Sequence, residues 1–458
     1  MHGLNLCGKM VLFKPSASIQ NKTFSFMWRT LASFMTTRAA DASSELPVFQ
    51  YATEKTSKTT RVYTWGHASY GALGNANFIK PKDGKKVLKN LYRPYRLEFA
   101  ETHKVFDVAC GYGFTVFAAF SSNSNHRAFG TGLNTDSQIG FHMVRKDHPL
   151  QQLAQPVPIH LPLESSSTKA VKVACGRAHS VILTDKEGIF TLGNNAFGQC
   201  GRVIVENEVY EGSTRVNKVS GIDGEVIDVV CGQDHTLFLT KEGRVYSCGW
   251  GADGQTGLGH YNSQGKPGVV KGDIEKERII KLCTAVDCVL AVSDNGDLFG
   301  WGNSEYGQFS NVTDALQVNV PRHVPLSNIG KILDAAVGGT ICAVLNDKGQ
   351  VFVWGYGILG QGPQVAQLNS PTLLPEELFG RNEFNPEVKV THIKCGLNQF
   401  AAITNQGDLY MWGKNRHACL GLGHKNDQYF PFRVSVPAQV LKISLGVDHT
   451  AVLCKAFS

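Results

Sequence analysis

A segment of the form Val-x-x-Val-x-Cys-Gly returns seven times along the chain, and this repeat restricts the fold more than any other feature. Counted from the glycine position, the steps between copies are 65, 56, 53, 53, 58 and 50 residues. Such spacing indicates one structural unit used seven times. The copies are Val105–Gly111, Val171–Gly176, Val226–Gly232, Ile279–Ala285, Ile332–Gly338, Val390–Gly396 and Val440–Gly446.

Each unit reads as a series of short strands. In the second unit, Val171–Gly176 alternates apolar and polar residues, His179–Thr184 is apolar, and Asp185–Gly188 is a hairpin turn. A Trp-Gly-like pair ends the next strand, and four of the six tryptophans stand at this position: Trp65, Trp301, Trp354 and Trp412. Turns at such close intervals without helical periodicity predict an all-β chain.

The two ends of the repeat region complete each other. Val440–Leu453 supplies the first strands of a seventh unit, and the matching second half, Arg61–Gly74, stands at the beginning. Pairing these segments closes a ring and removes exposed sheet edges. The sequence therefore predicts a seven-bladed β-propeller of four-stranded blades over residues 61–458, closed by pairing of the N- and C-terminal strands.

The charge is concentrated at the N-terminus. Residues 1–40 contain five basic and no acidic residues, whereas the whole chain carries a formal net charge of +7. Basic, hydroxyl-rich and acid-free segments are typical of mitochondrial transit peptides. We expect a transit peptide over 1–40, a linker over 41–60, and a mitochondrial protein of the matrix or associated with the inner membrane. The alternative is an untargeted tail.

Several classes of function are disfavoured. Gly249–Gly254 and Gly355–Gly360 match a dinucleotide-binding pattern, but Gln255-Thr-Gly and Gln361-Gly-Pro follow instead of a helix. There is no phosphate-binding P-loop motif and no C-x-x-C pair, and no apolar run of about 18 residues that would span a membrane. The sequence predicts no cofactor, no metal, no transmembrane segment and no bond-making chemistry.

The repeats resemble those of the regulator of chromosome condensation family. Val229–Thr240 and Gly302–Gln308 carry the resemblance, which spans residues 61–458 and is greatest to the family's mitochondrial branch. It implies a propeller that promotes guanine-nucleotide exchange on a GTPase, here a dynamin-type GTPase of the inner membrane. It also implies an association with mitochondrial ribosomal RNA and its assembly proteins.

Candidate GTPase contacts lie two and three residues beyond the motif glycine. The resemblance implies that acidic and histidine side chains of these loops touch the partner, which selects Asp234, Asp287, Asp448, His235 and His449. The simpler interpretation is that each aspartate bonds turn amides and that His179, His235 and His449 are buried and bonded to backbone. Cys110, Cys175, Cys231 and Cys395 read as small core residues.

A basic segment, Ile79–Arg96, reads as an insertion outside the repeat. A run of like charge is usually a solvated loop, but it also suits contacts with RNA phosphates or anionic lipid. Without exchange activity, the chain would be a ribosomal RNA-binding assembly factor or a pure interaction propeller. The candidate phosphate-binding residues are Lys80, Lys82, Lys85, Lys86, Lys89, Arg93 and Arg96.

Overall fold

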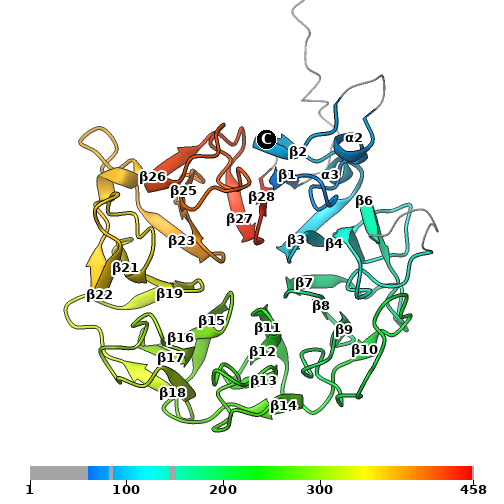
Figure 1. Ribbon diagram of the computed structural model, residues 1–458, viewed down its shortest axis with the longest axis horizontal. Coiled ribbons are helices and arrows are strands. Elements are labelled where there is room, and N and C mark those ends of the chain that lie inside the picture. Colours follow the sequence, from blue (N-terminus) through cyan, green and yellow to red (C-terminus); the bar gives the residue numbers. More distant parts are fainter. Residues whose placement is uncertain (1–59, 82–85, 144–150, 456–458) are drawn as a thin grey trace, which may run out of the picture. The chain divides into compact units, whose positions relative to one another are not determined.

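The structure is a computed structural model that describes residues 60–81, 86–143 and 151–455. Seven four-stranded antiparallel sheets form the blades of a ring around a central channel (Figure 1). This confirms the predicted all-β seven-bladed propeller. The predicted transit peptide over 1–40 and linker up to residue 59 lie outside the described residues.

The first strand of each blade lies at the channel and the second strand follows it outward (Figure 1). The first strands are β3 (Lys104–Cys110), β7 (Ala170–Cys175), β11 (Val226–Cys231), β15 (Ile279–Thr284), β19 (Ile332–Val337), β23 (Val390–Cys395) and β27 (Val440–Leu445). The second strands are β4 (Phe114–Phe120), β8 (His179–Thr184), β12 (His235–Thr240), β16 (Cys288–Ser293), β20 (Ile341–Asn346), β24 (Gln399–Thr404) and β28 (His449–Cys454).

The third and fourth strands complete each blade toward its outer edge. The third strands are β5 (Ala128–Leu133), β9 (Ile189–Gly193), β13 (Val245–Gly249), β17 (Leu298–Asn303), β21 (Val351–Tyr356), β25 (Leu409–Gly413) and β1 (Arg61–His67). The outer strands are β6 (Gln152–Ile159), β10 (Asn217–Lys218), β14 (Gln264–Val269), β18 (Gln317–Val324), β22 (Gln367–Leu373), β26 (Gln428–Val434) and β2 (Asn90–Arg96). In the part of the chain that the structure describes, three short helices lie in connections between strands: α2 (Ala76–Ile79), α3 (Phe99–Thr102) and η1 (Glu376–Phe379).

We number the blades from 1 (β3–β6) to 6 (β23–β26) and call the seventh the closing blade. Its strand order is β2-β1-β28-β27, so a strand near residue 61 pairs with the last strand of the chain. The register runs from Arg61 opposite Cys454 to Gly66 opposite His449. This confirms the predicted closure by strands from both ends.

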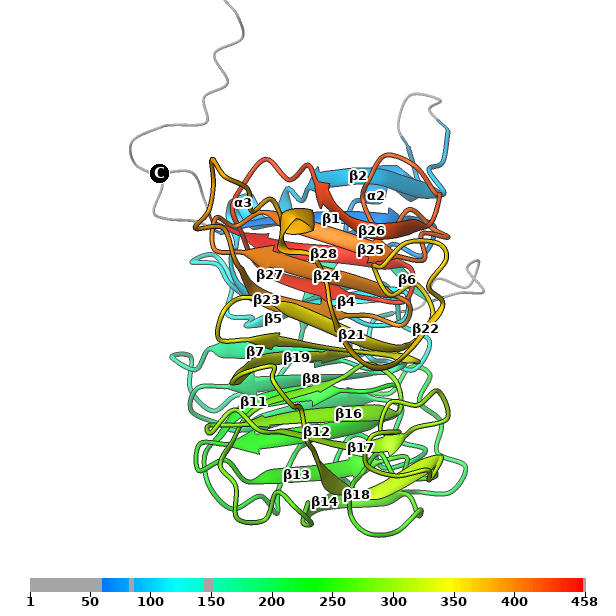
Figure 2. The same cartoon turned by 90° about the vertical axis from the view of Figure 1, so that its left-hand side faces the viewer.

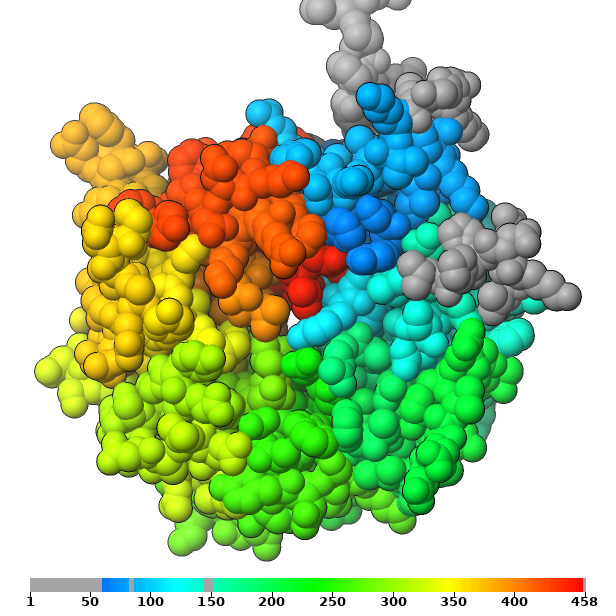
Figure 3. Space-filling view, in the orientation of Figure 1, coloured from blue at the N-terminus to red at the C-terminus, as the bar shows by residue number. Residues whose placement is uncertain are grey.

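The apolar core lies between the blades. One cluster joins Met411 and Ala401 of blade 6 to Trp65 of the closing blade, and the next joins Val62 and Ala451 to Phe117 of blade 1. The repeated tryptophans are buried here. Trp65, Trp301 and Trp354 each donate Nε1–H to a loop carbonyl of the preceding blade, at 2.7, 3.0 and 2.9 Å. The blades therefore pack against one another around the ring through shared apolar clusters (Figure 3).

Part of the predicted basic insertion belongs to the propeller. Residues 90–96 form β2, the outer strand of the closing blade, which leaves only the connection between α2 and β2 as an insertion.

Six outer strands contain a bulge, in which three residues of the outer strand lie opposite one residue of the third strand. The last of these three residues is a proline in each case. These prolines are Pro94, Pro156, Pro267, Pro321, Pro371 and Pro431.

Candidate functional site

One face of the ring carries the turns between the first and second strands, and we call it the turn face. The side view shows turns projecting from both faces (Figure 2). In every blade, the residue after the third-strand glycine donates its N–H to the carbonyl of the residue that precedes the second strand. For example, His67 donates to Asp448 and Trp250 donates to Asp234, both at 2.8 Å. The turn face therefore holds Asp234, Asp287 and Asp448 at equivalent positions.

Asp234 and Asp287 belong to one partly buried cluster. Arg177 Nη2 lies 2.6 Å from Asp234 Oδ2, and Gln255 Nε2 donates to Asp287 Oδ1 at 2.9 Å. Burial, together with the carboxylate of Asp253, raises the pKa of Asp287 to about 6. Burial also raises the pKa of Tyr112 to about 12, with contributions from Asp287 and Asp234. The cluster thus presents desolvated acidic groups beside a single arginine.

Asp448 has different partners. Its carboxylate lies 3.2 Å from His67 Nδ1 and 3.1 Å from His449 Nδ1. Burial acts to raise the pKa of Asp448, but these two interactions outweigh it and hold the pKa below its ordinary value. Burial acts to lower the pKa of His449, whereas the neighbouring Cys110 and Asp448 act to raise it. The net effect raises this pKa to about 10. Asp448 therefore fixes the closing blade internally.

The repeated histidines are buried, as predicted, but they do not bond backbone through Nε2. That atom instead lies beside a hydroxyl Oγ1 of the next blade: Thr236 for His179 at 3.0 Å, Thr284 for His235 at 3.3 Å, and Thr115 for His449 at 2.8 Å. Because His235 and His449 are fully enclosed, they cannot touch a partner in this structure. Their role as GTPase contacts stays a prediction, whereas in this structure they couple neighbouring blades.

Aromatic pairs across blade junctions were not anticipated from the sequence. Phe197 packs edge-on against Trp250 with centroids 4.4 Å apart, and Tyr306 stacks on Tyr356 at 5.9 Å. In both pairs, the second residue directly follows a third-strand glycine on the turn face. Tyr306 and Tyr356 are 41% and 48% exposed. The signal in the sequence was an aromatic residue after the repeated glycine.

The basic segment lies at the outer edge of the closing blade. Lys80, Lys86, Lys89 and Arg93 are exposed, whereas Lys82 and Lys85 lie outside the described residues. Arg96 forms an ion pair with Glu101 at 2.5 Å. Tyr92, 38% exposed, stands between Lys89 and Arg93 in the sequence, and Lys425 Nζ lies 5.9 Å from its ring centre. The structure therefore separates this segment from the acidic cluster of the turn face.

The described residues form neither a metal site nor a reactive thiol site. No group of three or more His, Cys, Asp or Glu side chains there could hold a metal ion. Burial raises the pKa of Cys231 to about 12 and of Cys175 and Cys395 well above the ordinary value. These thiols are therefore core residues, as the sequence indicated.

Known proteins match along most of the chain. A family model of the RCC1-like domain matches residues 206–457, and models of the regulator of chromosome condensation (RCC1) repeat match 61–118 and 170–199. The mouse RCC1-like G exchanging factor-like protein is 51% identical over 429 residues, which are 92% of each chain.

Two solved structures share the propeller. Human WBSCR16 is 50% identical, with a TM-score of 0.82, over 88% of this chain and 100% of that chain. Prp20p from Saccharomyces cerevisiae is 19% identical, with a TM-score of 0.69, over 88% of this chain and 93% of that chain, and this likeness shows the fold alone.

Proposed function

Because the chain belongs to the regulator of chromosome condensation (RCC1) repeat family, we propose that it promotes guanine-nucleotide exchange on a GTPase bound at its turn face. The observation that carries this proposal is the 51% identity to the mouse RCC1-like G exchanging factor-like protein over 92% of both chains. Prp20p, a propeller of the same fold, was described together with its binding properties to Gsp1p and histones, which supports a protein partner.

Exchange needs no bond-making chemistry. A factor that binds the nucleotide-free GTPase more tightly than the loaded form weakens nucleotide binding by the difference. Such a surface needs rigid contact groups. The turn face supplies them, because Arg177 and Gln255 hold Asp234 and Asp287 in place and because the exposed Tyr306 and Tyr356 pack on each other.

The exposed groups, rather than the buried ones, are the contact residues of this proposal. Asp234 is enclosed and paired with Arg177, so its truncation would disturb the fold as well as binding. Tyr306 and Tyr356 offer large apolar area with a polar tip, the kind of side chain that dominates protein interfaces. Asp287 is partly accessible and remains the best placed of the three predicted aspartates.

The test measures release of fluorescent GDP from a purified candidate GTPase. The unmutated protein should accelerate release, and Tyr306→Ala combined with Tyr356→Ala should lower the acceleration at least about tenfold, because central aromatic contacts typically cost about 2 kcal/mol or more. Lys348→Ala, in the turn between β20 and β21 on the opposite face of the same blade as Tyr356, is the matched control. No acceleration by the unmutated protein would exclude this GTPase.

The proposed partner is a dynamin-type GTPase of the mitochondrial inner membrane. The basic, acid-free composition of residues 1–40 supports a mitochondrial location. Within the described residues, no helix has the length and apolar character needed to cross a bilayer. Removing residues 1–40 should leave the propeller folded and prevent import into mitochondria. Import of the shortened chain would contradict the proposed location.

A second candidate function is binding of mitochondrial ribosomal RNA without exchange. The observation that favours it is the exposed Tyr92 among Lys86, Lys89, Arg93 and Lys425, since an aromatic ring among cations suits unpaired bases and phosphates. Lys86→Glu with Lys89→Glu should weaken RNA crosslinking in a salt-dependent way and leave GDP release unchanged. Lys348→Glu should change neither measurement. Unchanged crosslinking in the Lys86 and Lys89 variant would reject this candidate.

A further inference from the structure

The first strands enclose a channel of about 440 Å³ that neither proposed function uses. In six blades, the residue three positions before the end of the first strand is charged and lines this channel. Going round the ring, these residues are Asp107, Lys172, Asp228, Lys281, Asp334 and, in the closing blade, Lys442; blade 6 has His392 at this position.

The six charged residues form three pairs. In each pair, a lysine contacts the aspartate of the next blade: Lys172 with Asp228, Lys281 with Asp334 at 3.0 Å, and Lys442 with Asp107. The aspartates also accept backbone N–H groups. Asp107 accepts from Val173 of the next blade at 3.0 Å, and Asp334 accepts from Ile393 of the next blade at 3.2 Å. Every one of these charges is therefore compensated.

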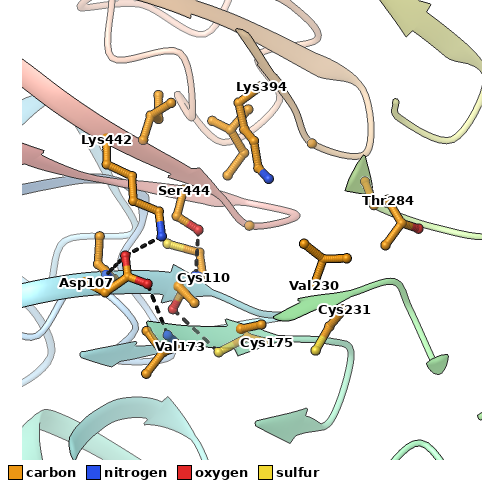
Figure 4. Close-up of a pocket in the computed structure, with 18 of the residues that line it drawn as sticks. Asp107, Cys110, Val173, Cys175, Val230, Cys231, Thr284, Lys394, Lys442 and Ser444 are labelled. Carbon is orange, nitrogen blue, oxygen red and sulfur yellow. Dashed lines mark hydrogen bonds and ion pairs between the residues drawn. The ribbon is translucent and has the colours of Figure 1, made fainter. Parts of the chain in front are cut away.

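Lys394 does not fit this arrangement. It stands on β23 one residue before Cys395, where the other blades carry uncharged side chains: Ala109, Ala174, Val230, Cys283, Ala336 and Ser444. Figure 4 shows its ammonium group directed into the channel. Within the described part of the chain, this group has no hydrogen-bond or ion-pair partner. The channel lining holds four lysines and three aspartates, which leaves one positive charge in excess.

A second donor lies on the neighbouring strand. Ser444 occupies the position equivalent to Lys394 on β27, and its Oγ accepts the N–H of Cys110 at 2.9 Å. Its hydroxyl proton has no acceptor among the residues that the structure describes. Burial lowers the pKa of Lys394, and the charges of Lys281 and Lys442 lower it further against the effect of Asp334. An ammonium group in this place lacks a counter-ion.

We propose that the central channel binds a small oxyanion, a phosphate or carboxylate group, between Lys394 and the hydroxyl of Ser444. The unprotonated oxygens of a phosphate or carboxylate group accept hydrogen bonds, which matches two donors that lack acceptors. The channel is large enough for such an ion with several waters, since one water occupies about 30 Å³ of the liquid. Bound there, the anion would neutralise the excess charge.

Calorimetric titration of the full chain with inorganic phosphate, and separately with succinate, tests this proposal and distinguishes the two sources of the oxyanion. Ionic strength is held constant with chloride. We expect saturable binding of at least one anion, and Lys394→Ala should weaken it at least about tenfold, the scale of one charge-assisted hydrogen bond. Alanine is native at this position in blades 1, 2 and 5, so the variant should fold.

Two further variants complete the design. Lys389→Met removes the same charge from an exposed lysine directly before β23 and should leave binding within about twofold of the unmutated protein, as expected for a distant surface charge. Lys394→Met should melt at or above the temperature of the unmutated protein without anion, and added phosphate or succinate should no longer raise that temperature. Absence of binding by both anions, or binding that survives Lys394→Ala undiminished, would overturn the proposal.

Discussion

At the scale of single residues, the same Asp-His dipeptide has two opposite electrostatic outcomes. Asp448 bonds the Nδ1 of His449 and favours the charged imidazolium. Asp234 pairs with Arg177 instead, and the Nδ1 of His235 has no partner among the described residues. Burial lowers the pKa of His235 to about 3. The two dipeptides therefore differ in the partner of the aspartate, which is Arg177 of the neighbouring blade for Asp234 and the two histidines for Asp448.

A pH dependence of stability follows from His179 and His235. Burial lowers the pKa of both to about 3, below the value of about 6.5 in an unfolded chain, so their contribution is full above pH 6.5 and is lost as the pH falls toward 3. Each of the two histidines should lower the free energy of unfolding by about 2 kcal/mol at pH 5 relative to neutral pH. Replacing both with glutamine, the residue that blade 6 carries as Gln399, should flatten the melting temperature between pH 7 and 5.

The control for this prediction is His126→Gln, since His126 lies in the connection between β4 and β5 and bonds no neighbouring blade in the described structure. It should leave the acid-induced loss of stability largely in place. An equally steep loss in the double glutamine variant would show that other groups control the acid response.

At the scale of the elements, β1 is one of the two central strands of the closing blade. It pairs with β28 on one side and β2 on the other, and Thr64 lies opposite Ala451 and Tyr95. Proline is tolerated in the outer strands because their N–H groups at the bulge need no ladder partner, but in a central strand it removes a ladder hydrogen bond.

Thr64→Pro should therefore destabilise the propeller strongly. The expected loss exceeds about 2 kcal/mol, because proline removes a backbone donor from a strand that is paired on both sides and its ring clashes with the neighbouring backbone. Thr64→Val keeps the backbone N–H and removes only the hydroxyl bond to the carbonyl of Leu73, so it should cost about 1 kcal/mol. Chemical denaturation followed by tryptophan fluorescence compares the two. Equal losses would contradict a closing role for the β1 backbone.

The first three strands and the closure were predictable from the sequence, because they carry the motif cysteine, the apolar run and the Trp-Gly-like pair in constant spacing. The outer strands were not, because they are exposed and lack an apolar pattern. Residues 90–96 consequently read as part of an insertion in the sequence, although they form β2. The repeated proline was the signal that marks these strands.

The site was less predictable than the fold. Positions in the repeat located Asp234, Asp287 and Asp448 on one face, but whether each is exposed depends on residues in other blades. Likewise, the partner of each repeated histidine is a threonine of the next blade, which lies 57 residues away for His179, 49 residues away for His235 and 334 residues away for His449. Such pairings follow from blade packing, which periodicity alone does not specify.

At the scale of the whole molecule, the blades share side chains as well as edges. Asp107 contacts Lys442 of the closing blade and the N–H of Val173 in blade 2, so three consecutive blades meet at one carboxylate. Together with the buried histidine–threonine contacts, this arrangement links neighbouring units directly. We therefore expect the propeller to unfold as one unit.

Asp107→Asn tests this expectation by differential scanning calorimetry. Loss of the charge leaves Lys442 without its partner and weakens the contact to Val173, which should cost about 2 kcal/mol or more. The melting transition should shift as a whole. Asp294→Asn, which changes an exposed turn carboxylate 3.8 Å from Arg278, should shift it little. Two separate transitions in the Asp107 variant would show that the blades melt independently.

The pairing of lysine and aspartate between adjacent blades has a consequence that follows from parity. Two signs can alternate all the way round a ring only when the number of members is even, and this ring has seven. One member must break the alternation, and its place is a choice that the backbone leaves open. In this protein the break falls on β23. Exchanging the residues of two blades at the position of these lysines and aspartates would move the break to another blade. A symmetric scaffold can therefore carry one asymmetric position in any of its seven blades.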